Sequence, residues 1–262
     1  MRLKPIYISA PSRSGSSLLI KMLNSTANIV VVNEPINSVN IVDKNNIEAI
    51  FNSIEEDLRH GFITQRVGED GIEATDTFPP SRIKWGRLNH PFEGTDVIGI
   101  KKSFPAFSNK DFFDLFIREW PNFVRWMNER MGGGVVVIVR DPRFTILSWK
   151  TTFEALKEST ENQCIAWNFI ADAILISRDS GVKIIRYEDL VQNPKSVIEI
   201  IASHLRVEVK IKEILPIVKQ FAPEDYLNNK GIPISSAEVE FRIVEKLCGE
   251  VAKNFGYVKM HT

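Results

Sequence analysis

The chain has 262 residues, with 33 basic and 33 acidic side chains and a formal net charge of zero at pH 7. Charged residues make up 25% and hydrophobic residues 44%, which excludes long disordered tails and collagen-like repeats. Zero net charge also argues against nucleic-acid binding, which needs a broad basic surface. There is no run of about 18 apolar residues to span a membrane, and the apolar stretch near the N-terminus is too short for a signal peptide. We therefore expect a soluble, cytoplasmic protein.

The pattern of elements in chain order alternates short apolar runs with helical periodicity. It predicts strand 6–10, helix 16–25, strand 29–32, helix 47–59, strand 97–100, helix 110–131 broken at Pro121, strand 135–139, helices 142–156 and 161–177, strand 183–185, and helices 194–205 and 237–255. Runs that are apolar on both faces are typical of parallel strands covered by helices on each side. The predicted class is therefore α/β, with ligands at the carboxyl ends of the strands.

The domain organisation follows from the absence of a Pro/Gly/Ser-rich linker. We expect a single domain over residues 1–262, with a variable insertion at about 43–96 whose run TFPPSRIKWGRLNHPFEG is loop-like. Cys164 and Cys248 have no Cys or His at metal-ligand spacing, so we expect small core residues in a reducing compartment and no bound metal. The sequence leaves monomer and homodimer open.

The first local pattern is IYISAPSRSGSSLLIKML, which predicts a strand, a turn of small residues and a helix. Such a turn directs backbone N–H groups and the positive end of the helix dipole at one point, so it predicts an anion site. It is not a Walker A loop, because Ala10 replaces the first Gly and Ser16 the Lys. The cation is Arg13, inside the turn. An ordinary capped helix is the alternative.

The second pattern is VVVIVRDPRFTILSWK, in which Arg140 ends a strand and Asp141 and Pro142 begin a helix. Ser148 lies two helical turns after Asp141, so its hydroxyl returns to the face on which the helix begins. Arg140 and Ser148 can therefore converge on one anion, since a guanidinium and a hydroxyl both bind phosphate. The alternative is an ion pair of Arg140 with Asp141 or a Glu.

Together these patterns resemble a known family. PSRSGSSLL resembles the 5′-phosphosulfate loop of the sulfotransferases that use 3′-phosphoadenosine 5′-phosphosulfate (PAPS), in particular their carbohydrate and bacterial branches, and the Arg140 to Ser148 spacing resembles their 3′-phosphate motif. The resemblance covers most of the chain except 43–96. It implies a P-loop NTPase-like sulfotransferase fold, PAPS as sulfuryl donor, the 3′,5′-bisphosphate PAP as product, and no required metal.

Two further segments resemble the same family. RYEDLVQNP is similar to a segment that implies a position of Tyr187 against the adenine, and the C-terminal run SSAEVEFRIVEKLCGEVAKNFGY resembles the terminal helix of bacterial sulfotransferases. A Trp-Arg or Arg-Lys-Gly element that often precedes or opens this helix is not recognisable, so no C-terminal contact to the 3′-phosphate is assigned. The residues that the resemblance implies for cofactor binding are Ser12, Arg13, Ser14, Gly15, Ser16, Ser17, Arg140, Ser148 and Tyr187.

Sulfuryl transfer needs positioning, cations near the transferred group and a base for the acceptor hydroxyl. We expect Arg13 and Lys102 to supply the cations, with Lys101 beside them at the end of strand 97–100. IKKSFP resembles the family's base-bearing segments, but Ser103 stands in place of the His and Lys101 in place of the Glu.

The missing base has a candidate replacement in Glu34, which follows strand 29–32 as part of a Glu-Pro pair. Carbohydrate sulfotransferases carry a similar pair at this position. We expect Glu34 to be the general base, and an ion pair with Arg13 or a lysine is the alternative. His60 and His90 are reserve candidates.

The expected reaction moves a sulfuryl group from PAPS to a hydroxyl of a small molecule, sugar or secondary metabolite. The insertion is expected to cover this acceptor with aromatic and basic side chains. They are Phe78, Arg82, Lys84, Trp85, Arg87 and Phe92. Two alternatives remain open: a P-loop small-molecule kinase that uses ATP and Mg²⁺, and a non-catalytic nucleotide-binding scaffold.

Overall fold

The computed structural model describes residues 3–35, 42–67, 84–104, 110–152, 158–209, 211 and 234–257. Five strands form one sheet in the order β2-β5-β1-β6-β7, and every neighbouring pair is parallel. The strands are β1 (Lys4–Pro11), β2 (Ile29–Asn33), β5 (Val97–Phe104), β6 (Gly134–Val139) and β7 (Val182–Arg186). The predicted α/β class and all five predicted strands are confirmed, and each strand is longer than its predicted range.

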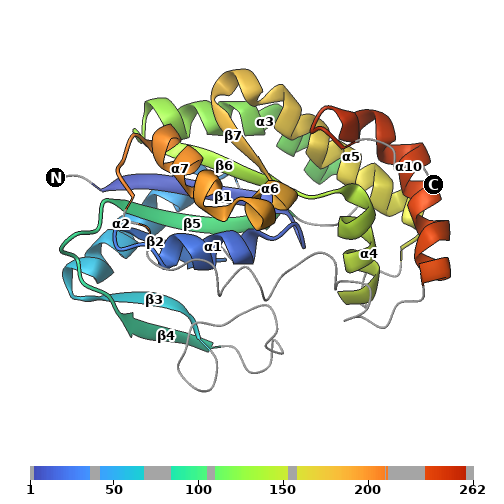
Figure 1. Ribbon diagram of the computed structural model, residues 1–262. Helices are drawn as coiled ribbons and strands as arrows, with labels where there is room; N and C mark the ends of the chain where they lie inside the picture. The colour runs from blue at the N-terminus through green and yellow to red at the C-terminus, as the bar shows by residue number, and fades with distance from the viewer. Residues whose placement is uncertain are drawn as a thin grey trace.

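Helices cover both faces of the sheet, which is why its strands are apolar on both faces (Figure 1). In β1, Tyr7 belongs to one core, while Ile6 and Ile8 belong to the other. Each such side chain contributes about 1.5–3 kcal/mol on burial. The helices of the first core are α2 (Lys44–Arg59), α3 (Lys110–Glu129), α4 (Pro142–Thr152), α5 (Thr160–Ile176) and α10 (Ile234–Lys253). Those of the second are α1 (Ser16–Asn24), α6 (Tyr187–Gln192) and α7 (Pro194–Leu205).

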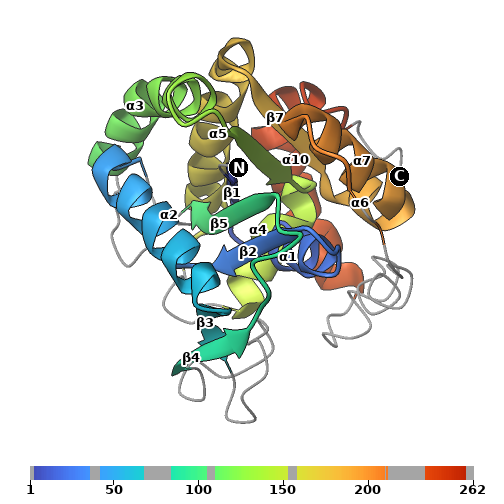
Figure 2. The same cartoon turned by 90° about the vertical axis from the view of Figure 1, so that its left-hand side faces the viewer.

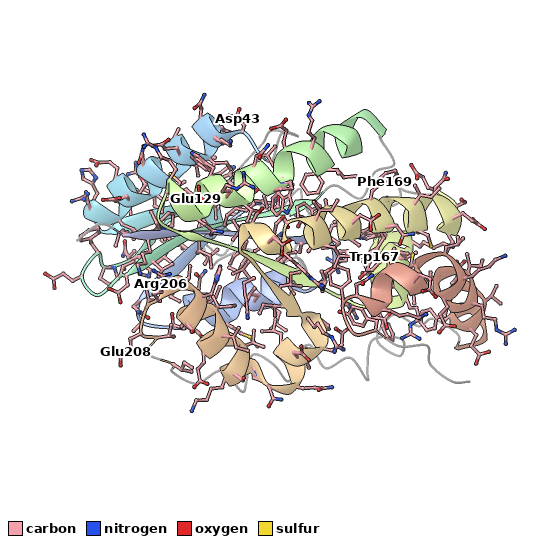
Figure 3. All side chains as sticks on the ribbon, turned by 90° about the horizontal axis from the view of Figure 1, so that it is seen from above. Asp43, Glu129, Trp167, Phe169, Arg206 and Glu208 are labelled. Atoms are coloured by element: carbon pink, nitrogen blue, oxygen red, sulfur yellow. The ribbon has the colours of Figure 1, made fainter. Side chains whose placement is uncertain are left out.

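The C-terminal helix α10 packs along α5 at the end of the molecule opposite the N-terminus (Figure 1). Figure 3 shows Trp167 of α5 beside α10, and its ring meets Phe255 edge-on at 6.2 Å between centroids. Cys164 and Cys248 are buried free thiols in the same contact, where the Cys248 Sγ donates to the Cys164 carbonyl over 3.8 Å. The expectation of small core cysteines is confirmed.

Helix α3 corrects the prediction of a break at Pro121, because it runs through the proline. Trp120, Phe123, Val124 and Met127 lie fully buried on its core face. These side chains hold the helix against the sheet on both sides of the proline, and this packing outweighs the hydrogen bond that proline cannot donate.

The run 77–94 was expected to be loop-like, and its described part corrects that prediction. Strand β4 (Lys84–Asn89) pairs antiparallel with β3 (Phe62–Val67), and this hairpin forms a second sheet, with β3 next to β2 (Figure 2). The sequence of β4, KWGRLN, gives little apolar signal because the strand is largely exposed. Helix α6 and a 3₁₀ turn at Arg178–Ser180 were also not predicted. Residues 77–83 and 153–156 lie outside the described part.

In the described part of the chain, no helix is long and apolar enough to cross a membrane. The same residues contain no group of three or more His, Cys, Asp or Glu side chains that could hold a metal ion.

Candidate functional site

The five parallel strands end at one edge of the sheet, and each is followed or ended by a residue singled out in the sequence. These residues are Arg13 after β1, Glu34 after β2, Lys101 and Lys102 in β5, Arg140 after β6 and Tyr187 after β7. Ligands of open parallel sheets bind outside this edge. The central position of β1 between β5 and β6 brings the predicted anion loop next to both lysines and Arg140.

The loop between β1 and α1 is a tight turn. Ser14 donates its N–H to the Pro11 carbonyl over 3.1 Å, and Arg13 and Gly15 have positive φ angles of 66° and 88°. Gly15 is the N-cap of α1, and no side chain caps the helix there. The Trp149 indole of α4 donates to the Ser12 carbonyl over 2.6 Å and so fixes the loop from the other side.

Two hydroxyls of this loop are buried without a hydrogen-bond partner among the described residues, those of Ser12 and Ser14. A buried hydroxyl without a partner costs about 1–3 kcal/mol. An anion held at the loop would accept hydrogen bonds from both hydroxyls and from the N–H groups of the first turn of α1. The donors of the loop therefore fit a phosphate or sulfate group.

The ring of Tyr187 lies directly against Gly15. A Cβ at Gly15 would come within 2.1 Å of the Tyr187 Cδ2 atom, so this position needs glycine for close approach as well as for its positive φ. Tyr187 is buried, and the Arg140 guanidinium lies 4.7 Å from its ring centroid. The contact of Tyr187 with an adenine stays a prediction.

The two sequence motifs meet in space. The Arg13 Nε donates to the Ser148 Oγ over 3.2 Å, and the Arg140 Nη1 lies 3.5 Å from the Arg13 carbonyl. Arg140 and Ser148 are only 6% and 1% exposed, so their polar groups face a site with little water. The carboxylate of Asp141, one of the alternatives for Arg140, binds Arg143, whose Nε lies 2.9 Å from Oδ1.

Glu34 forms an ion pair with each of two lysines. Its Oε1 lies 2.7 Å from the Lys101 Nζ and its Oε2 lies 3.0 Å from the Lys102 Nζ, while the Ser103 N–H also donates to Oε1 over 3.1 Å. Burial raises the pKa of Glu34, but the charges and hydrogen bonds of these partners outweigh it and lower the pKa from 4.5 to about 2. In this arrangement the single charge of Glu34 offsets one of the two lysine charges, and the carboxylate is a weak base.

Arg13 and Glu34 share an unusual backbone. Both have positive φ, 66° and 54°, although neither is glycine. Such a conformation costs of order 1 kcal/mol or more and persists where surrounding contacts fix it, often at ligand sites. For Glu34 the contact is the hydrogen bond from its own N–H to the Lys101 carbonyl, 2.8 Å long.

Some residues of this edge were not found by sequence reasoning. Trp149 had no role although it follows Ser148, and the sequence did not decide between Arg13 and a lysine as the partner of Glu34. Of the reserve candidates, His60 is exposed and His90 is half-buried. Each has a backbone oxygen near its Nδ1, that of Glu56 and that of Pro91 respectively.

The residues expected over the acceptor are only partly described. Phe78 and Arg82 lie outside the described part. Lys84 and Trp85 are exposed on β4, and the Arg87 guanidinium lies 4.3 Å from the Phe62 ring centroid across the hairpin. That these side chains cover an acceptor stays a prediction.

No protein-family model matches this sequence, and no curated protein matches it. Among solved structures, it is similar to the sulfotransferase domain of the olefin synthase of Synechococcus PCC 7002, with 17% identity over 99% of this chain and 97% of that one and a TM-score of 0.48. A sulfotransferase from Alicyclobacillus acidocaldarius has 15% identity, coverage of 91% and 100%, and a TM-score of 0.45. For mouse sulfotransferase SULT7A1 complexed with PAP the identity is 12%, the coverage 85% of this chain and 66% of that one, and the TM-score 0.44.

Proposed function

We propose that the protein is a PAPS-dependent sulfotransferase that moves a sulfuryl group to a hydroxyl of a sugar, small molecule or secondary metabolite. The observation that supports this most directly is the contact of two separate anion motifs, in which the Arg13 Nε donates to the Ser148 Oγ over 3.2 Å. PAPS carries phosphate at both its 5′ and 3′ positions, so its binding site needs two neighbouring anion sites of this kind.

In this proposal each part of the site has one task. The loop Ser12–Ser17 binds the 5′-phosphosulfate through backbone N–H groups and hydroxyls, and the two unpartnered hydroxyls of Ser12 and Ser14 support this task. Arg140 and Ser148 bind the 3′-phosphate. Arg13 and Lys102 stabilise the charge on the sulfuryl group and on the departing bisphosphate. No step in this scheme uses a metal.

In this proposal Glu34 is the general base that takes the proton from the acceptor hydroxyl. Its carboxylate is held between Lys101 and Lys102, which keeps it ionised but weakens it as a base. Binding of the sulfuryl donor would draw Lys102 toward the new negative charge, and the loss of one ion pair would raise the pKa of Glu34. The two catalytic tasks of Glu34 and Lys102 are coupled in this way.

The test is binding followed by turnover. Isothermal titration calorimetry with PAP, and separately with ATP and Mg²⁺, measures which nucleotide the loop accepts. We expect PAP to bind without Mg²⁺ and ATP to bind more weakly. Turnover is then measured as PAP release from PAPS over a panel of sugars and phenols. Binding of ATP with Mg²⁺ but not of PAP would support the kinase alternative and contradict the proposal.

A non-catalytic nucleotide-binding protein is the second candidate, and one observation favours it. Every oxygen of the proposed base is bound to a cation or to the Ser103 N–H. This candidate predicts that PAP binds as tightly as proposed while no acceptor in the panel releases PAP from PAPS. Turnover by the wild-type protein separates the two candidates. Where it is found, a Glu34→Gln variant should retain PAP binding and lose turnover if Glu34 is the base.

A further inference from the structure

A carboxylate and a phenol lie against the backbone on the two sides of Arg140. On the carboxyl side, Asp141 donates its N–H to the Glu188 Oε1 over 3.1 Å. On the amino side, the Tyr257 hydroxyl lies 3.3 Å from the Val139 carbonyl. The hydroxyl donates its single proton to the Glu188 Oε2 over 2.8 Å, so Tyr257, Glu188 and the Asp141 N–H form one chain of hydrogen bonds.

The residues of this chain of hydrogen bonds come from three distant parts of the sequence. Glu188 lies in α6, directly after β7, while Tyr257 follows the C-terminal helix α10. Tyr257 is 7% exposed, and the Arg186 guanidinium lies 4.8 Å from its ring centroid. Burial raises the pKa of the Tyr257 phenol, and the Glu188 charge raises it further, so the hydroxyl remains a donor at any working pH.

The hydrogen-bond chain is also connected to the anion loop, through Tyr187. Tyr187, which precedes Glu188, lies against Gly15 and beneath the Arg140 guanidinium. A shift of Glu188 would therefore move two neighbours of Arg140 together, the Asp141 backbone and the Tyr187 ring. Arginine binds phosphate best when its guanidinium is fixed in advance, because less rotational freedom is then lost on binding.

We propose that Glu188 and Tyr257 are positioning residues that fix Arg140 for the 3′-phosphate, so that the C-terminal end of the chain sets how well the site distinguishes a 3′,5′-bisphosphate from a 5′-monophosphate. This inference rests on the proposed function for its ligand. In this role neither residue binds the nucleotide itself, and both act through the backbone of Asp141.

The test is a comparison of PAP with adenosine 5′-monophosphate (AMP) in a Tyr257→Phe variant, which keeps the ring and removes the hydroxyl. Loss of one hydrogen bond behind Arg140 should weaken PAP binding by about 3- to 10-fold. AMP binding should change by less than about 2-fold, because AMP lacks the phosphate that Arg140 binds. A Glu188→Ala variant should show the same loss of discrimination, and adding Tyr257→Phe to it should have little further effect.

A Glu240→Gln variant is the matched control. Glu240 lies on the same C-terminal helix and binds Lys150 and Thr160, away from the Arg140 backbone. The Glu240→Gln substitution loosens α10 without breaking the Glu188–Tyr257 contact. The ratio of PAP to AMP affinity in this variant should therefore equal that of the wild type. An equal loss in this control would assign the effect to general loosening and overturn the positioning role.

Amide hydrogen exchange without ligand provides a readout that does not depend on the proposed function. In Tyr257→Phe the Asp141 N–H should exchange faster than in the wild type, and in the Glu240→Gln control it should not. Unchanged exchange at Asp141 would overturn the inference whether or not PAP binds. Faster exchange in a protein that fails to bind PAP would instead show that the hydrogen-bond chain exists and that the proposed function is wrong, and with it the role in phosphate binding.

Discussion

Arg140 is the residue on which the 3′-phosphate assignment depends. Its guanidinium is almost fully buried, beside the Arg13 carbonyl and the rings of Tyr187 and Phe144. Arg140→Ala should weaken PAP binding by about 1–3 kcal/mol, the contribution of a charged hydrogen bond. Isothermal titration calorimetry measures the change. Arg130→Ala, at an exposed position after α3, is the control and should leave the affinity unchanged. Equal affinity in both variants would contradict the assignment.

The ion pairs of Glu34 should make the stability of the folded protein depend on pH, also without a ligand. Its folded pKa of about 2 lies below the value of 4.5 expected for the unfolded chain. The ion pairs with Lys101 and Lys102 therefore stabilise the fold fully above about pH 4.5, and this stabilisation is lost as the pH falls toward about 2. The difference between the two pKa values corresponds to about 3 kcal/mol.

Urea unfolding at several pH values measures this contribution. Glu34→Gln cannot ionise, so the difference in unfolding free energy between wild type and variant should shrink by about 3 kcal/mol between pH 6 and pH 2. At neutral pH the variant should be the less stable protein, because it leaves Lys101 buried without its carboxylate. A difference that stays constant with pH would show that Glu34 is not held as an ion pair.

At the scale of the elements, helix α3 continues through Pro121, and this proline should lower the stability of the fold. Proline in a helix interior costs up to about 3 kcal/mol relative to alanine, since it lacks an N–H and its ring meets the preceding turn. Pro121→Ala should therefore raise the unfolding free energy by about 1–3 kcal/mol, measured by urea denaturation. If two shorter helices met at Pro121 instead, the substitution would bring no gain.

Both α3 and β4 show what sequence patterns leave out. The five central strands were predictable because both their faces are buried, which leaves continuous apolar runs such as VVVIV. Strand β4 has mostly exposed side chains, so its sequence carries no such run, and its pairing with β3 depends on tertiary contacts. The continuity of α3 likewise depends on the packing of Trp120 and Phe123 in the core.

In the candidate site, too, some features could be predicted from local sequence and others depend on how the chain folds. Each anion motif is local in sequence, so the loop at Arg13 and the pair Arg140 and Ser148 could be identified one at a time, and parallel strand order brings them together. The partners of Glu34 come from β5, 67 residues further along the chain, and no local pattern distinguishes Lys101 from Arg13 as its partner. That choice follows from β2 lying next to β5 in the sheet.

For the whole molecule, zero net charge and a polyanionic ligand are compatible because the positive charge is gathered at one sheet edge. Arg13, Lys101, Lys102 and Arg140 all lie there, and Glu34 offsets part of their charge. A ligand with several negative charges would draw on this local excess and would not need a basic surface elsewhere.

Helix α2 of the insertion packs into the same hydrophobic core as the central sheet. Phe51 of α2 is 2% exposed and shares a hydrophobic core with Val30 of β2 and Trp120 of α3. We propose one cooperative domain, so Phe51→Ala should lower the unfolding free energy of the whole protein by about 3–5 kcal/mol. Asn52→Ala, exposed on the same helix, is the control and should change it by less than about 0.5 kcal/mol.

Urea unfolding followed by far-UV circular dichroism and by tryptophan fluorescence measures both effects. A Trp85→Phe background removes the exposed indole of the hairpin. Fluorescence then reports on four tryptophans, the buried Trp120, Trp149 and Trp167 and the half-buried Trp126. In a single domain the two signals share one midpoint, and Phe51→Ala lowers both midpoints equally because α2 and the sheet lose the same core together. If circular dichroism lost part of its signal at a lower urea concentration than fluorescence, α2 and the hairpin would form a separate unit, and the assignment of one domain would be wrong.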